Sequence, residues 1–112
     1  MFVKRLEGGL EFGRDAKRIV AIWETYLPIG EMILPHLHTD LEEIYYILSG
    51  KGLMHIEDER KEVESGDVIY IPPEKVHTLQ NISQENLRFL TLSVNVSEKK
   101  DMSYLAQVPY HQ

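Results

Sequence analysis

The sequence predicts an all-β protein built as an antiparallel sandwich or barrel, and three observations support this. Short segments rich in β-branched and aromatic residues recur along the chain, as in strands. Glycine, proline and polar turn residues separate these segments at regular intervals, which is typical of antiparallel architectures. Within residues 17–27, where Trp23 and Tyr26 stand among β-branched residues, no helical stripe of apolar side chains stands out.

In the first half of the chain, four strands are expected between clear breaks. Pro28 and Gly30 end the first of them, and the run Ser49-Gly50-Lys51-Gly52 closes the third with a turn. The expected strands cover residues 17–27, 31–38, 43–48 and 53–57.

In the second half, turn signals again bound the expected strands. The acidic residues 57–60 make a polar reversal, 65–67 and 83–86 are turns, and Pro72-Pro73 cannot donate to a β-ladder. The expected strands cover residues 62–64, 68–71, 77–81 and 87–96. The tail of residues 97–112 is polar with scattered aromatics, and the sequence does not fix its structure.

Composition limits the class of protein. A chain of 112 residues corresponds to one domain, residues 1–112. The absence of cysteine excludes disulfides, zinc fingers and thiol catalysis, and fits a reducing cytoplasmic compartment. A net charge of −6 argues against nucleic acid as a partner. No apolar stretch approaches the roughly 20 residues of a membrane span, and the first residues lack the apolar core of a signal peptide.

Two of the expected strands are apolar on both faces. Residues 44–48 and 68–71 do not alternate between apolar and polar side chains. Such strands need cover on both sides, from the interior of the protein on one and from another layer or subunit on the other. The pattern therefore predicts a homodimer.

Three histidines and a glutamate form the candidate functional site. His36 and His38 are two residues apart, so on an extended strand both imidazoles point to the same face. Glu43 follows closely, and His77 lies further along the chain. Imidazole and carboxylate ligands suit divalent Mn, Fe, Ni, Cu or Zn, and no thiolate favours softer chemistry. The sequence predicts a metal-centred β-protein, without identifying the metal.

Two motifs resemble those of the cupin family of small double-stranded β-helix, or jelly-roll, barrels. The first, in residues 30–50, has Gly30, five residues, His36-Leu37-His38, four residues, Glu43, six residues and Gly50. The second, in residues 66–81, has Gly66, five residues, Pro72-Pro73-Glu74, two residues, His77, three residues and Asn81. One position departs from the family pattern, because Glu74 stands where the family usually has a glycine.

The resemblance implies a minimal single-domain cupin that holds its metal with His36, His38, Glu43 and His77. Counting back six residues from Gly50 selects Glu43 rather than Glu42 as the carboxylate, and Glu42 is expected to be a solvated turn residue. The glycine replaced by Glu74 normally allows a turn, so the local backbone is in question there.

The remaining candidates have weaker signals. His55 has no partner at ligand spacing and is expected to point outwards, whereas Asn81 is expected to bind backbone groups at a turn. Glu43 shares strand parity with Tyr45, which makes Tyr45 the best candidate for a hydroxyl in the pocket and the candidate catalytic residue. Other residues that either line a pocket or pack in the core are Trp23, Tyr26, Met54 and Tyr70.

This ligand set leaves two functional hypotheses. With two open positions, a divalent ion would capture a small ligand through two oxygens, such as a hydroxy acid, keto acid, sugar acid or phenol-like compound. The first hypothesis is a metalloenzyme acting as an oxygenase, isomerase or decarboxylase, and the alternative is a binding or sensing module without turnover. A proton donor is also needed for isomerisation or decarboxylation, and Glu24 and Tyr26 are candidates only if their face of the strand is internal.

Overall fold

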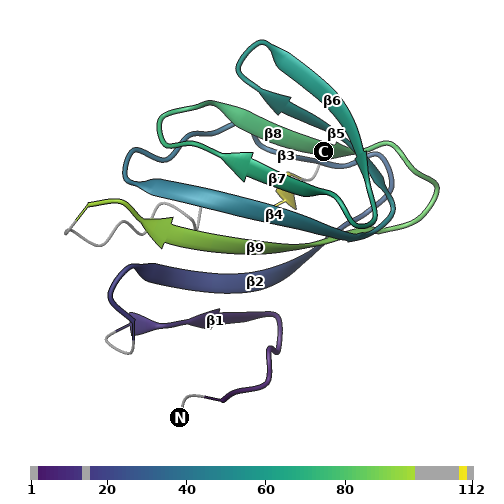
Figure 1. Ribbon diagram of the computed structural model, residues 1–112. Helices are drawn as coiled ribbons and strands as arrows, with labels where there is room; N and C mark the ends of the chain where they lie inside the picture. The colour runs from purple at the N-terminus through teal and green to yellow at the C-terminus, as the bar shows by residue number, and fades with distance from the viewer. Residues whose placement is uncertain (1–2, 14–15, 98–108, 111–112) are drawn as a thin grey trace.

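The computed structural model describes residues 3–13, 16–97 and 109–110, and β-strand dominates the regular structure in that part of the chain. Ten strands follow in order within these described residues (Figure 1). Their bounds are β1 (Gly9–Glu11), β2 (Ile19–Leu27), β3 (Met32–Ile33), β4 (Leu41–Ser49), β5 (Lys51–Ile56), β6 (Glu59–Glu64), β7 (Val68–Ile71), β8 (His77–Asn81), β9 (Leu87–Asn95) and β10 (Pro109–Tyr110). In that same part of the chain no helix is long and apolar enough to cross a bilayer.

The strands form two five-stranded antiparallel sheets. Sheet A has the order β1-β2-β9-β4-β7, and sheet B has the order β10-β3-β8-β5-β6 (Figure 1). The prediction of an all-β, jelly-roll barrel is confirmed. In both sheets the chain crosses between non-consecutive strands, so residues distant in sequence become neighbours.

An apolar core joins the inner faces of the two sheets. Its largest wholly buried side chains include Leu27, Tyr45 and Phe89 from sheet A and Ile33 and Leu79 from sheet B. Burying a side chain of this size contributes about 1.5–3 kcal/mol to stability. The core therefore fixes the sheets against each other and positions the polar residues of the inner face.

Several strands differ from the sequence prediction. The strand expected at 31–38 is only Met32–Ile33, because Pro35 has no N–H to donate to a ladder, and His36 then forms an isolated bridge with His77. No strand is expected at Gly9–Glu11, yet β1 pairs there with β2. β6 begins at Glu59 rather than at residue 62, because the charged residues pair along β5. Of the tail, residues 98–108 and 111–112 lie outside the described residues, whereas Pro109–Tyr110 pairs with β3.

Two turns place a residue in the left-handed backbone conformation, at Gly50 and at Glu74. Gly50 has φ +87°, and a Cβ there would lie 2.9 Å from both the Asn86 carbonyl oxygen and the Leu87 Cα, so a side chain is excluded. Glu74 has φ 65°, the left-handed conformation that glycine adopts readily. Its N–H donates to the His38 carbonyl over 2.7 Å. Glu74 thus keeps the glycine-like backbone at this turn, with a non-glycine residue in a strained region.

Candidate metal centre

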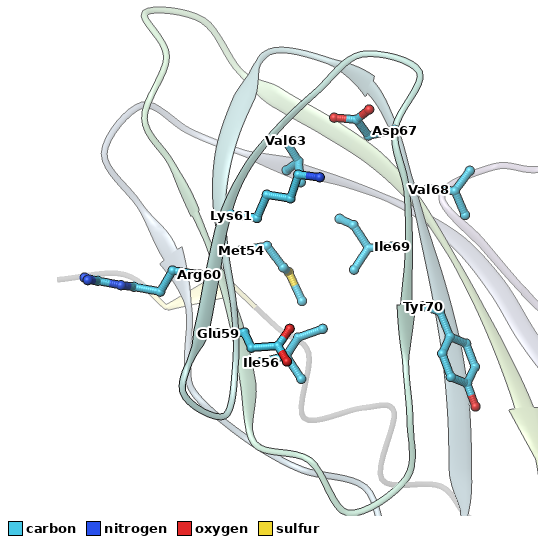
Figure 2. A pocket seen from close by; sticks show the side chains of 10 residues that line it. All are labelled: Met54, Ile56, Glu59, Arg60, Lys61, Val63, Asp67, Val68, Ile69 and Tyr70. Carbon is cyan, nitrogen blue, oxygen red and sulfur yellow. The ribbon is translucent and has the colours of Figure 1, made fainter.

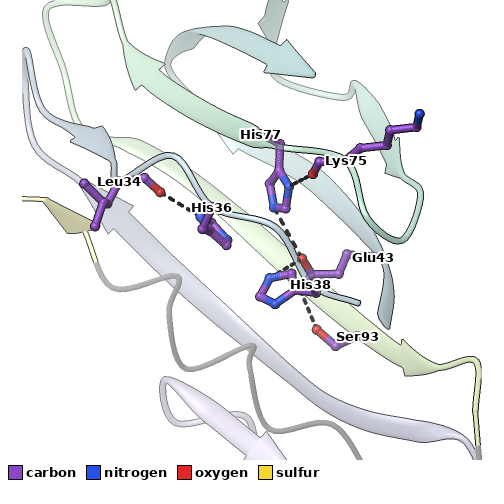
Figure 3. Close-up of polar contacts among 7 residues, drawn as sticks. All are labelled: Leu34, His36, His38, Glu43, Lys75, His77 and Ser93. Atoms are coloured by element: carbon purple, nitrogen blue, oxygen red, sulfur yellow. Dashed lines mark hydrogen bonds and ion pairs between the residues drawn. The ribbon is translucent and has the colours of Figure 1, made fainter. Parts of the chain in front are cut away.

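The histidines meet because the segment that follows β3 runs beside the start of β8 in sheet B. The backbones of His36 and His77 exchange hydrogen bonds of 3.2 and 2.9 Å in an isolated antiparallel bridge. Two residues further on, the His38 carbonyl accepts the N–H of Glu74, which holds the loop before His77 against the histidine segment. Both segments present their imidazoles to the interior, towards β4 of sheet A (Figure 3).

The three imidazoles and one carboxylate converge. One ligand atom each of His36, His38 and His77 lies within 4.8 Å of the others. Oε1 of Glu43 lies 3.2 Å from Nε2 of His38 and 3.6 Å from Nε2 of His77 (Figure 3). His38, Glu43 and His77 are buried, and His36 is half-buried. These four side chains are positioned to bind a metal ion.

Backbone carbonyls fix the orientation of two of the rings. Nδ1 of His36 donates to the Leu34 carbonyl over 2.7 Å, and Nδ1 of His77 donates to the Lys75 carbonyl over 2.9 Å. A carbonyl only accepts, so each Nδ1 carries the proton and the neutral ring keeps its lone pair on Nε2. In both residues Nε2 is buried and has no hydrogen-bond partner. Such a hydrogen bond behind the ring is the arrangement that orients metal-ligating histidines.

The pKa shifts of His36 and Glu43 favour the protonation states that bind a cation. Burial and the neighbouring His77 and His38 lower the pKa of His36 to about 4, against the opposing effect of the Leu34 hydrogen bond, so its ring is neutral at pH 7. Burial alone would raise the pKa of the Glu43 carboxyl. The neighbouring His38 imidazole, 3.2 Å away, and the hydrogen bond from the Ser93 hydroxyl outweigh burial and lower that pKa to about 2. Glu43 is therefore a carboxylate over the whole physiological range.

Nε2 of His77 and Oε1 of Glu43 provide a test of whether the residues fit a metal. With its proton on Nδ1, a neutral His77 faces the carboxylate at 3.6 Å with a lone pair, so two acceptors oppose each other in a buried space. A cation between them removes this conflict. Nitrogen and oxygen ligands at about 2.0–2.2 Å are typical of first-row divalent ions. The donor set therefore fits such an ion.

Sequence reasoning missed two residues on β9. The Ser93 hydroxyl donates to Oε2 of Glu43 over 2.6 Å and so orients the carboxylate. Thr91 lies one inward position away, paired with Tyr45 and Trp23, and its wholly buried hydroxyl has no hydrogen-bond partner. The alternation of Thr91, Ser93 and Asn95 with apolar residues is a signal that could have found them.

The other polar candidates lie away from the cluster. Glu42 is on β4 rather than in a turn, on the opposite face from Glu43, where it accepts a hydrogen bond from the Tyr70 hydroxyl over 2.9 Å. His55 is half-buried on β5 and does not belong to the histidine group. Asn81 binds backbone groups, because its amide nitrogen donates to the Leu27 and Glu85 carbonyls over 2.9 and 2.7 Å.

The aromatic candidates divide between the two faces of sheet A. Tyr45 is wholly buried, with its ring 4.9 Å from Phe89 and 6.2 Å from His77 between centroids. Tyr26 and Tyr70 point outwards and are half-exposed, so they do not line the interior. Glu24 shares the outer face with Tyr26 and pairs with Arg88 over 2.6 Å, which removes it as an internal proton donor. Trp23 is half-buried, and Met54 is buried in the core.

A separate cavity of about 520 Å³ lies between β5, β6 and β7. Figure 2 shows Met54, Ile56 and Ile69 pointing into it, with Glu59 and Lys61 entering from β6. Val68 and Tyr70 turn away from it. The described residues that line it include no histidine.

Comparisons of the sequence with known proteins agree with this geometry. The family model described as "Cupin domain" matches residues 23–94. An uncharacterized protein of Methanocaldococcus jannaschii is 43% identical over 82 residues, covering 73% of this chain and 66% of the relative. A Thermotoga maritima protein named oxalate-binding protein is 32% identical over 68 residues, covering 61% of this chain and 56% of the relative. The match thus spans less than two thirds of each of these relatives.

Solved structures share the fold over most of the chain. A predicted oxalate decarboxylase from Thermotoga maritima superposes with a TM-score of 0.72 at 24% identity, covering 83% of this chain and 89% of the other. A cupin protein from Bacteroides fragilis gives a TM-score of 0.68 at 28% identity, covering 89% of this chain and 86% of the other.

Proposed function

Because this chain belongs to the cupin family, we propose that it binds one divalent transition-metal ion and, through that ion, a small ligand with two chelating oxygens. His36, His38, Glu43 and His77 would hold the ion, which is Mn, Fe, Ni, Zn or Cu. One observation carries the proposal. The buried Nε2 atoms of His36 and His77 have no hydrogen-bond partner and open onto the space beside the Glu43 carboxylate.

The proposed ligand is a small carboxylate, such as oxalate or a hydroxy or keto acid. Three neutral imidazoles and one carboxylate leave a divalent ion with a net charge of about +1, which favours an anion. The name of the Thermotoga relative, oxalate-binding protein, supports the same class. When bound, the ion would supply Lewis-acid polarisation of the ligand oxygens.

Residues of the inner wall would contact the ligand beside the ion. The Thr91 hydroxyl is buried without a partner, and it lies next to Tyr45 in the pairing of β9 with β4. An unsatisfied buried hydroxyl costs stability, and a ligand oxygen or carbonyl would satisfy it. We assign Thr91 as a donor to the ligand, with the Tyr45 ring as the adjacent wall.

Binding without turnover is the form of this function that the side chains favour. Among the described residues the wholly buried titratable side chains are His38, Glu43, Tyr45 and His77. With three of these committed to the ion, Tyr45 is the one buried group left to carry a proton, and it is the candidate catalytic residue of the alternative, an oxygenase, isomerase or decarboxylase.

Calorimetric titration of oxalate into the manganese-loaded protein tests the proposal. We expect one oxalate per chain with the metal present and no heat of binding after dialysis against chelator. His77→Ala should abolish binding, whereas the matched variant His55→Ala should bind as the unchanged protein does. Equal binding with and without metal contradicts the proposal. Loss of oxalate with release of carbon dioxide establishes the enzymatic alternative.

We propose that residues 1–112 form one cupin domain that works in the cytoplasm as a homodimer, with a small molecule rather than nucleic acid or membrane as its partner. The net charge of −6 supports this choice over a phosphate backbone.

A further inference from the structure

We propose that the cavity between β5, β6 and β7 is a second ligand site, for a small zwitterion with an apolar body and about the length of a dipeptide. The cavity measures about 520 Å³, which lies within the roughly 300–1,000 Å³ of small-molecule sites. Its walls include the strands that end the two sheets in the described part of the chain, β6 in sheet B and β7 in sheet A. The site lies outside the metal centre and adds a binding activity to the proposed function.

The floor of the cavity is apolar. Met54 and Ile56 of β5, Val63 of β6 and Ile69 of β7 line it. Met54 and Val63 are buried, whereas Ile56 and Ile69 are half-buried and pack against the core. Covering these side chains would remove apolar surface from water, which favours a ligand with an apolar body.

Two opposite charges stand over this floor, at inward positions of β6. Glu59 pairs with Ile56 and Lys61 pairs with Met54, so both charged side chains share the inner face with the apolar residues. Figure 2 shows both side chains entering the cavity. Both are exposed, and neither takes part in the salt bridges found among the described residues. A carboxylate and an ammonium group are therefore available to a ligand.

The other charged residues of the wall are less available. Oδ2 of Asp67 accepts the backbone N–H of Glu64 over 2.7 Å, which ties this carboxylate to the turn before β7. The Arg60 side chain turns away from the cavity (Figure 2). Glu59 and Lys61 are thus the two charges that a bound molecule would meet above the apolar floor.

These two charges favour a zwitterion over other small molecules. A purely apolar ligand would remove water from both charges without replacing its hydrogen bonds, which is costly. An anion would pair with Lys61 but be repelled by Glu59, and a cation would meet the reverse. A molecule with an ammonium group at one end and a carboxylate at the other satisfies both through charge-assisted hydrogen bonds.

The spacing of the charges sets the length of that molecule. Glu59 and Lys61 are two residues apart on one strand, which separates their Cα atoms by about 6.4–6.8 Å. An extended dipeptide spans roughly 6.6–7.2 Å, whereas a free amino acid carries both charges on a single Cα. A dipeptide with apolar side chains therefore matches the charges and the floor together.

Addition of a whole strand is disfavoured at this place. Inward-pointing charges and short edge strands oppose pairing with another chain, and β7 has only four residues. A small molecule meets no such obstacle, because it needs the space between the strands and not their backbone edges.

The register of the strands separates this cavity from the metal centre. Ile56 pairs with His77 across β5 and β8, and Ile69 pairs with Tyr45 across β7 and β4. Each isoleucine thus stands between the cavity and a residue of the inner wall near the metal ligands. Dipeptide binding is therefore expected with or without metal, and its failure is distinguishable from failure of metal binding.

Nuclear magnetic resonance of the full chain, labelled with methyl-¹³C methionine, tests the inference. The Met54 methyl group reports from the cavity, and Met32 is an internal control, because β8 and β5 separate its strand β3 from β6. Leucyl-leucine should shift the Met54 signal to saturation and leave Met32 unmoved, equally with chelator and with added Zn²⁺. Glycyl-glycine lacks the apolar body and N-acetyl-leucyl-leucinamide lacks both charges, so each should bind at least about 10-fold more weakly.

Variants of β6 test the two charges. Glu59→Gln and Lys61→Gln should each weaken leucyl-leucine binding about 10-fold or more, since each removes one charge-assisted hydrogen bond. Glu62→Gln is the matched control, because Glu62 pairs with Leu53 on the outer face of the same strand, and it should bind as the unchanged protein does.

Four results would overturn the inference. The first is an unmoved Met54 signal up to about 10 mM leucyl-leucine, where a millimolar site would be nearly saturated. The second is equal binding of either control peptide. The third is binding that Glu59→Gln or Lys61→Gln leaves unweakened, or that Glu62→Gln weakens equally. The fourth is binding that requires the metal ion, which would place the dipeptide at the metal centre.

Discussion

Along residues 90–95 of β9 the two faces of the strand are opposite in character, and each reverses the usual pattern. Its inward residues Thr91, Ser93 and Asn95 are polar and buried, whereas the outward Leu90 and Leu92 are apolar and partly exposed. A sheet stabilised by its own core alone would show the opposite alternation. On the inner face this departure from the usual pattern places Ser93 against the candidate metal ligand Glu43.

A second contrast runs along the inner face of sheet A. At one end Phe89 and Ile47 pair across β9 and β4 and belong to the apolar core. At the other end Ser93 and Glu43 pair and are joined by a hydrogen bond. The apolar end supplies the burial that stabilises the sandwich. The polar end uses that rigid frame to hold groups whose burial costs stability.

The largest expected effect is a loss of metal affinity, and it should depend on which face of β9 is changed. Ser93→Ala removes the hydrogen bond that orients Glu43 and should weaken metal binding about 10–100-fold, the usual effect of losing such a partner. Leu92→Ala, one residue away on the outer face, should leave metal affinity unchanged. Competition with a chromophoric chelator measures both. Equal losses in the two variants would show that the effect is general destabilisation.

Acid should destabilise the inner face through two groups. The pKa of His36 falls from 6.5 to about 4 on folding, so between these values the unfolded chain binds more protons and stability drops as pH decreases. The pKa of Glu43 falls from 4.5 to about 2, which continues the loss below pH 4.5. Urea unfolding of metal-free protein measures this. His36→Gln should flatten the part between pH 6.5 and 4, and an unaltered slope in that variant would refute the assignment.

Substitution of two buried threonines distinguishes a proposed ligand contact from a structural hydrogen bond. Thr91→Val removes a hydroxyl that has no partner and should stabilise the ligand-free protein by about 1 kcal/mol while weakening oxalate binding. Thr78→Val removes a hydroxyl that donates to the Ile33 carbonyl and should destabilise by about 1–2 kcal/mol. Urea denaturation and calorimetry read the two effects. Destabilisation by both variants would mean that the Thr91 hydroxyl has a structural partner.

The smallest effect concerns the turn before His77. Glu74→Gly should raise the free energy of unfolding by about 0.5–1 kcal/mol, because glycine adopts φ 65° without strain. The gain is limited by the extra freedom of glycine in the unfolded chain. Metal affinity should not change, since residue 74 is joined to the histidine segment by its backbone N–H. A loss of stability on denaturation would assign the Glu74 side chain a role of its own.

The sequence predicted most accurately those strands whose ends are marked by glycine or proline. β7 and β8 have the predicted limits, because Gly66 and Pro72-Pro73 mark where pairing must stop. β1 has three residues and depends on its pairing with β2, so no local sequence pattern predicts it. β6 is charged along most of its length, and its pairing with β5 overrides the weak propensity of those residues.

The sequence predicted those site residues that belong to motifs of fixed spacing. The two motifs located His36, His38, Glu43 and His77, and strand parity placed Tyr45 beside them. Ser93 was not predictable in this way, because its contact with Glu43 depends on the register of β9 against β4, fifty residues apart in sequence. Tyr26 and Tyr70 were assigned no face, and only the sheet topology shows that they point outwards.

Metal content is the most direct test of the central claim, that four side chains from separate segments hold one ion. Apoprotein would be incubated with Mn, Fe, Ni, Cu or Zn, desalted and measured by mass spectrometry of the elements. We expect about one ion per folded chain for at least one of these metals, and loss of that ion in His77→Ala but not in His55→Ala. Equal metal content in the folded His77→Ala variant, or no metal retained by the unchanged protein, would contradict it.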